Sequence, residues 1–138
     1  MVDYPQMLHT VLDTPNAREL AEFYRHLLGL QYRPGDEPPA DATAPDDPDW
    51  LVLVDDAGTR KLAFQRNKDT RPTTWPKPDV PMQLHVDFTV PSVEELQRQR
   101  ARAESLGATI LLDRTADEEE PLYVFADLAG HPFCIFVA

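Results

Sequence analysis

The feature that most constrains the fold of this chain is an internal repeat. Residues 6–15 read QMLHTVLDTP and residues 82–91 read MQLHVDFTVP, so each segment has a Leu-His pair followed by Pro six residues after the His. Such self-similarity at a fixed spacing indicates a duplicated structural unit. With a shift of 76 positions, five identities fall within thirteen pairs: Leu8/Leu84, His9/His85, Pro15/Pro91, Glu19/Glu95 and Leu20/Leu96.

A second match lies further along each half. VLVDDAGTRKLAF at 52–64 aligns with VFADLAGHPFCIF at 124–136, now with a shift of 72. The two matches keep their order along the chain, and the change of shift is explained by connecting loops of different length. The sequence therefore predicts that one half-domain occurs twice.

Each half has the same expected order of elements. QMLHTVL and MQLHVDFTV are rich in β-branched and apolar residues and predict strands. A helix follows each: Thr14 and Pro15 suit the start of the first, and Ser92 with Glu95 forms a capping box for the second. DDAG and DLAG predict hairpin turns before the last strand of each half. Short strands are expected at 30–34, 50–55 and 60–66, and at 108–113, 121–126 and 132–137.

This pattern predicts an α+β fold in which two tandem βαβββ modules form a curved mixed sheet around a shared cleft. We expect one domain over 1–138, with module 1 at about 4–66, module 2 at about 82–138 and a linker at 67–81. The Pro- and Asp-rich stretch 33–49 predicts an exposed, partly mobile loop. Trp75 is unusual in a linker; folding over a pocket and packing against a module explain it equally well.

The net charge of the chain restricts the classes of partner that it is expected to bind. The formal net charge is −11, from 24 acidic and 13 basic residues. Such a surface disfavours nucleic acid and anionic membranes and tolerates a cationic ligand. No apolar run approaches a membrane span, and the opening MVDYPQ does not resemble a signal peptide, so we expect a cytoplasmic protein. The acidic run 117–120 predicts a solvated loop.

A duplicated βαβββ unit of this length resembles the vicinal oxygen chelate superfamily, which includes glyoxalase I, extradiol dioxygenases and the fosfomycin- and bleomycin-resistance proteins. The resemblance is strongest in LHTVLDTPNARELAEFYRHLLGL, LHVDFTVPSVEELQRQRARAESLGA and FADLAGHPFCIF. Within the superfamily the chain is most similar to glyoxalase-like domain proteins, whose closing strand often reads Gly-Asn-Glu-Phe-Cys. Here that strand reads Gly-His-Pro-Phe-Cys at 130–134.

The resemblance implies metal ligands on the first and last strands of each half, commonly two His with one or two carboxylates. His9 and His85 occupy the first-strand positions. Strand alternation places His85 on one face with Gln83 and Asp87, opposite the apolar face expected to pack on the helix. The last-strand positions hold no carboxylate: Cys134 stands in the second half, and Leu62 or Gln65 in the first. Two interpretations stay open, a metal held by His9 and His85, or histidines that line a pocket without metal.

Two functions are therefore expected from the sequence. The first is a glyoxalase/bleomycin-resistance-like protein that binds a small molecule in the cleft, without a complete metal site. The alternative is a metal-dependent lyase or dioxygenase acting on a small oxygen-bearing substrate. We expect a homodimer, because C2 pairing is the commonest assembly. No catalytic residue is assigned, and a divalent metal is the one cofactor considered, with an incomplete ligand set. The candidate substrate-binding residues are His9, Gln65, Trp75, Gln83, His85, Asp87 and Cys134.

Overall fold

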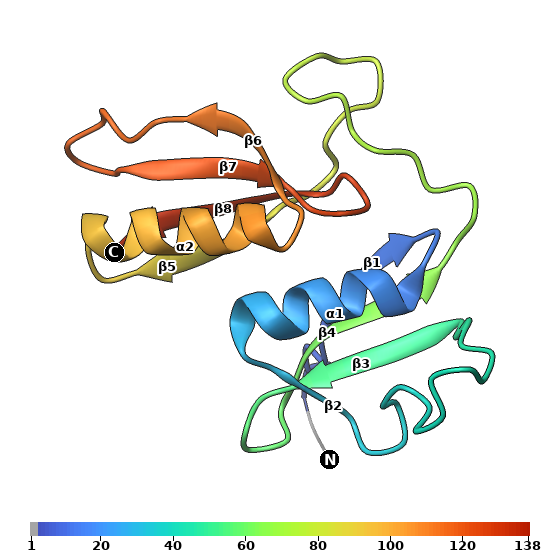
Figure 1. Ribbon diagram of the computed structural model, residues 1–138. Helices are drawn as coiled ribbons and strands as arrows, with labels where there is room; N and C mark the ends of the chain where they lie inside the picture. The colour runs from blue at the N-terminus through green and yellow to red at the C-terminus, as the bar shows by residue number, and fades with distance from the viewer. Residues whose placement is uncertain (1–2) are drawn as a thin grey trace. The chain divides into compact units, whose positions relative to one another are not determined.

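The computed structural model describes residues 3–138 and divides the chain into two compact units between Asp69 and Thr70 (Figure 1). We call these units the first and second modules. The first contains β1 (Thr10–Thr14), α1 (Ala17–Leu28), β2 (Gln31–Tyr32), β3 (Trp50–Val54) and β4 (Arg60–Arg66). The second contains β5 (Val86–Val90), α2 (Val93–Ser105), β6 (Thr109–Asp113), β7 (Leu122–Ala126) and β8 (Pro132–Val137).

The two modules have the same sheet topology. The strand order is β1-β4-β3-β2 in one and β5-β8-β7-β6 in the other. In each, the first strand pairs in parallel with the last, and the remaining pairs are antiparallel. The predicted α+β fold of two tandem βαβββ modules is confirmed, as two four-stranded mixed sheets. The shared cleft and the single curved sheet stay predictions.

Helix α1 covers one face of the first sheet. The buried helix residues include Leu20 and Tyr24, and the Tyr24 ring stacks on Phe64 of β4 with centroids 5.9 Å apart. Leu12 and Leu51 share this face, because each is a register neighbour of Phe64 on an adjacent strand. The side chains of the intervening residues of each strand therefore point to the opposite face of the sheet.

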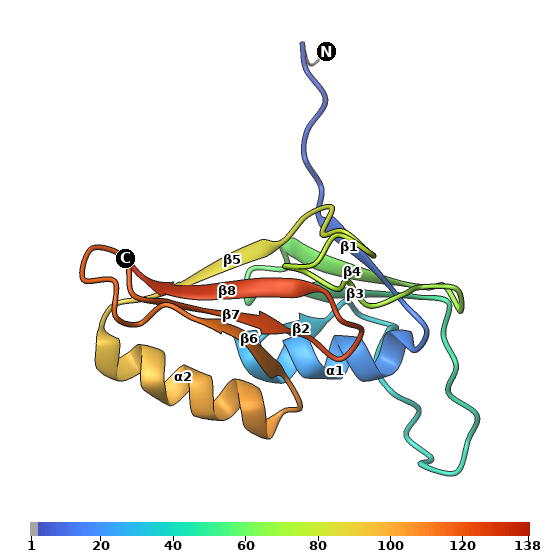
Figure 2. The same cartoon turned by 90° about the horizontal axis from the view of Figure 1, so that it is seen from above.

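Helix α2 lies along one face of the second sheet (Figure 2). It buries Leu96 and Ala103, and the sheet contributes an aromatic layer in which Phe133 stacks on Phe125 at 5.0 Å and lies 5.8 Å from Phe88. Among the residues described, no helix is long and apolar enough to cross a membrane.

The N-terminal cap of α1 differs from the predicted one, whereas that of α2 agrees with the prediction. Asn16, not Thr14, caps α1: its side-chain oxygen accepts a hydrogen bond from the Glu19 N–H at 3.1 Å. The Thr14 hydroxyl instead accepts from the Asn16 N–H, which shapes the turn before the helix. Ser92 caps α2 as predicted, through the Glu95 N–H at 3.1 Å. Propensity alone does not separate neighbouring candidate caps, because Thr and Asn both suit the position.

The two predicted hairpin turns have the same hydrogen bonds. The Asp55 carboxylate accepts from the Ala57 and Thr59 N–H groups, and the Asp127 carboxylate accepts from the equivalent N–H groups two and four residues on. Gly58 and Gly130 follow at φ 81° and 89°, a region that favours glycine. This shared turn explains why DDAG and DLAG are conspicuous in the repeat.

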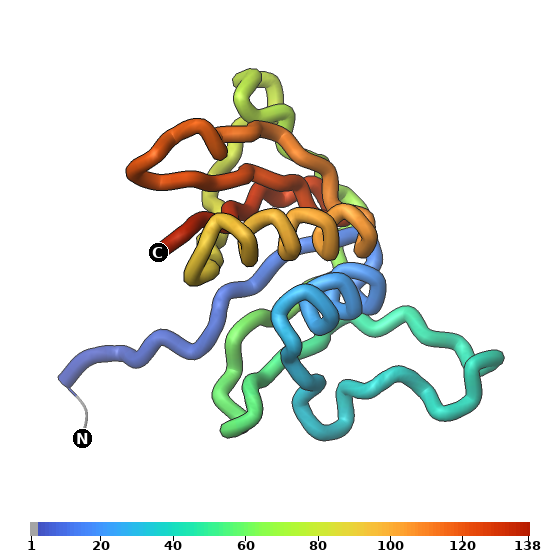
Figure 3. The backbone as a smooth tube through the Cα atoms, turned by 60° about the vertical axis from the view of Figure 1, so that its left-hand side comes forward, coloured from blue at the N-terminus to red at the C-terminus, as the bar shows by residue number. Residues whose placement is uncertain are grey.

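The 33–49 segment, which can be followed in Figure 3, is anchored to α1. Arg18 donates to the Asp46 carboxylate at 2.8 and 3.1 Å and to the Asp36 carbonyl at 2.7 Å. Its guanidinium also lies 4.9 Å from the centre of the Tyr32 ring. The segment has no regular secondary structure, as predicted, but charged hydrogen bonds hold its two ends.

Candidate functional site

Both repeated histidines lie immediately before a strand rather than inside it. β1 begins at Thr10 and β5 at Val86, so His9 and His85 each precede the first ladder position. A residue before Thr10 on β1 would pair with Lys61, which precedes Leu62 on β4. Lys61, however, has no partner on β1 or β3. In the same way, a residue before Val86 on β5 would pair with Pro132, which precedes Phe133 on β8 and has no N–H to donate. The observed strands therefore start later in the chain than the sequence pattern predicted.

Lys61 also changes which residue of the first module is equivalent to Cys134. Val54 pairs with Arg60 and Leu53 with Leu62, so Lys61 is an extra residue on β4. Such a bulge shifts the register by one. Val11 then lies beside Ala63 where Asp87 lies beside Cys134. The predicted equivalents, Leu62 and Gln65, were wrong: the structure places Ala63 there, which has no ligand atom.

The face of the second sheet opposite α2 contains a cavity. Residues of this face alternate with those that contact α2: Asp87 and Cys134 are neighbours on β5 and β8, and Val124 lies beside Cys134 on β7. The predicted alternation of His85 and Asp87 away from the apolar face is thus realised. The cavity volume is about 260 Å³. Its walls are Trp75, Met82, His85, Asp87, Leu112, Arg114, Glu120, Leu122, Val124, Cys134 and Phe136.

Trp75 reaches the cavity from a loop closed by its own hydrogen bonds. The Thr73 hydroxyl donates to the Val80 carbonyl at 2.7 Å, and the Val80 N–H donates to the Thr74 hydroxyl at 2.8 Å. The Trp75 N–H donates to the Thr73 hydroxyl. Trp75, in the segment predicted as a linker, therefore forms an aromatic wall of this cavity within the second module.

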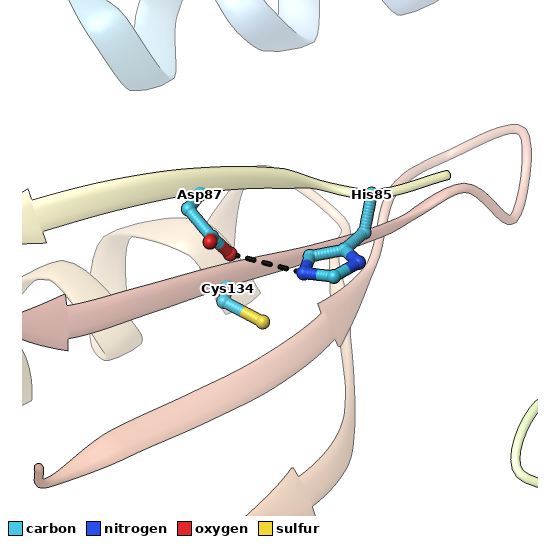
Figure 4. Close-up of side chains that lie close together, drawn as sticks. All are labelled: His85, Asp87 and Cys134. Carbon is cyan, nitrogen blue, oxygen red and sulfur yellow. Dashed lines mark ion pairs between the residues drawn. The ribbon is translucent and has the colours of Figure 1, made fainter.

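Three potential ligand side chains meet in this cavity (Figure 4). The Nε2 atom of His85 lies 3.3 Å from Oδ1 of Asp87, and one donor atom from each of His85, Asp87 and Cys134 lies within 4.8 Å of the others. Burial, together with the negative charge and hydrogen bonding of Asp87, raises the pKa of the Cys134 thiol to about 11. Without a bound cation the thiol is therefore protonated at neutral pH and is not a nucleophile.

The cavity has a negative electrostatic character. Asp87 and Glu120 both disfavour the thiolate of Cys134 through their charge. Arg114 also lines the cavity, but its guanidinium lies 3.1 Å from the Asp117 carboxylate, so its charge is largely offset. An anionic group entering this space would meet two carboxylates.

His9 lies in the first module, in a different environment. Its ring is 5.8 Å from the Trp50 ring, and its Nδ1 atom is buried without a hydrogen-bond partner among the residues described. Burial and the positive charges of Arg60 and Arg33 lower its pKa. His9 is thus a neutral imidazole near two guanidinium groups, which disfavour a cation beside it.

Gln65 lines a separate hollow in the first module. The Asn67 side chain donates to Asp13 there at 3.3 Å, and Asp49 forms an ion pair with Arg66 at 3.0 Å. This hollow is lined entirely by polar and charged residues. It lacks the apolar walls that orient a small organic ligand.

The structure thus brings together four of the seven predicted site residues. His85, Asp87, Cys134 and Trp75 line one cavity; Gln83 does not line it, and His9 and Gln65 lie in the first module. The other seven lining residues, from the segment before β5, from β6, β7 and β8 and from the loop between β6 and β7, were not predicted from the sequence: Met82, Leu112, Arg114, Glu120, Leu122, Val124 and Phe136. The alternation along the last three predicted strands could have indicated Leu122, Val124 and Phe136, because they share a face with Cys134.

Comparison with known proteins agrees with this architecture. A family profile described as a glyoxalase-like domain matches residues 9–136. Among solved structures, the fosfomycin resistance protein FosX from Listeria monocytogenes has a TM-score of 0.67 at 15% identity, covering 98% of this chain and 94% of that one. A glyoxalase/bleomycin resistance protein/dioxygenase family enzyme from Burkholderia phytofirmans has a TM-score of 0.66 at 14% identity, covering 94% and 96%. No curated protein matches significantly.

The fold and the repeated modules define a protein of the vicinal oxygen chelate superfamily. Within it, the chain belongs to the glyoxalase-like domain family, whose profile covers nearly its whole length. At these identities the solved structures show the shared fold, and activity has to be argued from the site.

The donor atoms of this chain do not fit the metal site that the resemblance implies. A mutant of FosX, in which a glutamate is replaced by glutamine, has been solved with Mn(II) and a dihydroxypropylphosphonic acid. Manganese prefers carboxylate, carbonyl and water oxygen. Here the last strands provide the Cys134 thiol and the Ala63 methyl group at the two equivalent positions. A hard cation therefore lacks its expected anionic oxygen ligands from β4 and β8.

Proposed function

We propose that this protein binds a small, largely apolar organic molecule in the cavity of the second module, as a glyoxalase/bleomycin-resistance-like binding protein without a complete metal site of the superfamily type. The supporting observation is a cavity with mostly apolar walls and a few polar groups. That composition is typical of small-molecule sites. A volume of about 260 Å³ favours a ligand of modest size.

The charges in the cavity favour a neutral or cationic ligand. Asp87 and Glu120 are carboxylates in its lining, whereas Arg114 is paired with Asp117. An ammonium group placed near these carboxylates would be attracted to both of them. The aromatic walls, Trp75 and Phe136, would contact the apolar body of the ligand and can also stabilise a cation.

The alternative is a metal-dependent lyase or dioxygenase acting on a small oxygen-bearing substrate. The adjacency of His85, Asp87 and Cys134 favours it, because these side chains could hold a cation or move a proton. The carboxylate of Asp87 lies within 3.3 Å of the His85 imidazole and can orient it as a proton acceptor. This alternative requires turnover of a substrate, which the binding proposal does not.

We also propose that the protein is a homodimer that functions in the cytoplasm. The support for the dimer is general, since C2 assemblies are the commonest among soluble oligomers. The location is the expectation drawn above from the sequence.

Trp75 provides a direct test of ligand binding. The chain has two tryptophans, and a Trp50→Phe variant leaves Trp75 as the one indole reporter. Hexylamine and hexanoate, titrated into chelator-treated protein, compare a cation and an anion on the same apolar chain. We expect the amine to change Trp75 fluorescence saturably and the carboxylate to bind at least about tenfold more weakly, a difference of about 1.4 kcal/mol.

Two variants of one acidic loop provide a matched control. Glu120→Gln removes a charge that lines the cavity, and Glu118→Gln removes the same charge two residues away from an exposed position outside it. We expect only the first to weaken amine binding. Absence of any saturable signal with either probe would overturn the binding proposal, and tighter binding of hexanoate would overturn the charge argument.

A further inference from the structure

We infer that His85, Asp87 and Cys134 form a binding site for a thiophilic divalent cation, of which Zn²⁺ is the representative, built entirely within the second module. The site differs in its ligands from the one that the family resemblance implies. It has one histidine instead of two, a carboxylate two residues after that histidine, and a thiol where a carboxylate is expected.

The backbone places the three side chains together for a simple reason. Asp87 and Cys134 are direct partners in the parallel ladder of β5 and β8, so both side chains point to the same face. His85 precedes Asp87 by two positions and returns to that face. Two neighbouring strands therefore hold Asp87 and Cys134, and His85 is attached directly before the first of them.

The separations are suited to one ion after a small adjustment. Zinc bonds of about 2.1 Å to nitrogen or oxygen and about 2.3 Å to sulfur place tetrahedral ligand atoms roughly 3.4–3.7 Å apart. The Nε2 atom of His85 and Oδ1 of Asp87 are already 3.3 Å apart, and all three donor atoms lie within 4.8 Å. Three protein ligands leave one position of a tetrahedral ion open, as in catalytic zinc sites.

The chemistry of the three donors selects the metal. Imidazole and thiolate suit Zn²⁺ and Co²⁺, whereas Mg²⁺ and Mn²⁺ prefer oxygen. A cation at this position would also offset the charges of Asp87 and Glu120, which lie near the thiol. The same two charges make the cavity unfavourable for an anion and favourable for a divalent cation.

The first module does not contain a second copy of this site. The positions equivalent to Asp87 and Cys134 are Val11 and Ala63, neither of which has a ligand atom. His9 remains, but the charges of Arg60 and Arg33 reach it and lower its pKa. The duplication kept the histidine in both halves, and only the second half combines it with two further ligands.

The test is cation binding to the untagged, chelator-treated full-length protein. Co²⁺ should bind with a stoichiometry of one per chain and give the intense near-ultraviolet charge-transfer absorption of a cobalt–thiolate bond. Zn²⁺ should displace it, whereas an excess of Mn²⁺ should not. Loss of a residue that only supports a metal ligand weakens metal binding about tenfold to a hundredfold. Cys134→Ser and Asp87→Asn should each weaken Zn²⁺ binding by more than this, because both residues are direct ligands.

His9→Ala is the control that separates this site from the one implied by the family. It should leave Co²⁺ absorption and Zn²⁺ affinity unchanged, as should His26→Ala at an exposed position of α1. Circular dichroism of each variant establishes that it is folded. The inference is overturned if no Co²⁺–thiolate absorption develops, if Zn²⁺ affinity survives both Cys134→Ser and Asp87→Asn, or if His9→Ala abolishes binding. Because the amine titrations use metal-free protein, failure here leaves the proposed ligand binding intact.

Discussion

Asp87 and Cys134 are direct partners in the parallel ladder of β5 and β8, whereas the equivalent pair in the first module is Val11 and Ala63. The same backbone arrangement therefore holds two ligand-type side chains in one half and two apolar ones in the other. Duplication preserved the scaffold, and the two copies diverged in what they present on the open face of each sheet.

The thiol of Cys134 should react slowly with alkylating agents. Burial, followed by the charge of Asp87, raises its pKa from an ordinary value of 9.0 to about 11, so little thiolate exists at neutral pH. In metal-free protein we expect the rate of iodoacetamide labelling to rise with a midpoint near pH 11. Cys134 is the one cysteine of the chain, so mass spectrometry of the intact protein reads the reaction directly. A midpoint at or below that of the urea-unfolded chain would contradict this.

The same shift predicts a loss of stability at alkaline pH. A folded-state pKa above the unfolded one means that the folded protein retains the proton more strongly. The contribution is fully present below pH 9.0 and is lost as pH rises toward about 11. We expect the stability of the wild-type protein relative to Cys134→Ala to fall over this range in urea titrations. A difference between the two proteins that is independent of pH would disprove it.

Gly130 should be far less tolerant of substitution than Gly58, its counterpart in the first module. Both have positive φ, so alanine is strained at either position by about 1 kcal/mol. A Cβ at Gly130 would also lie 2.6 Å from Cα of Pro72, whereas nothing lies within 4 Å of one at Gly58. We expect Gly58→Ala to cost about 1 kcal/mol and Gly130→Ala about 3 kcal/mol or more, measured by chemical denaturation. Equal costs would show that the segment around Pro72 yields freely.

Arg18 should control the order of the 33–49 segment. Its guanidinium donates to Asp46 and to the Asp36 carbonyl, and its side chain is 14% exposed. We expect Arg18→Ala to cost about 1–2 kcal/mol and to increase amide hydrogen exchange throughout 36–49. Arg98→Ala is the matched control, because Arg98 forms an exposed ion pair with Glu95 within α2, and its loss should change stability far less. Unchanged exchange in 36–49 after loss of Arg18 would mean that other contacts order the segment.

The oligomeric state can be measured directly in solution. We expect a homodimer in light scattering coupled to size-exclusion chromatography at micromolar concentration. The chain mass is 15.7 kDa, so a dimer has a mass of about twice that value. A monomer throughout the concentration series would reject the proposal, and it would leave the cavity of the second module unaffected as a binding site.

The sequence alone determined the architecture. A repeat of βαβββ with alternating strands, helices ending in glycine and the turns DDAG and DLAG restricts the chain to two similar modules. The repeat is found by comparing two segments of the sequence. The other signals are local: each depends on residues a few positions apart, so all of them can be detected without knowing which elements pack together. The face assignment of His85 and Asp87 was equally accessible, because alternation follows from strand geometry.

Only the tertiary structure decided which residues share a site. Lys61, which has no partner in the ladder, shifts β4 by one position, so Ala63 and not Leu62 or Gln65 became the counterpart of Cys134. No pattern in the sequence marks such a bulge, because it depends on pairing with β3. In the same way, β6, β7 and the Trp75 loop lie far from Cys134 in sequence and line one cavity with it. Ladder register and loop closure are long-range properties, and the packing of strands distant in sequence sets them.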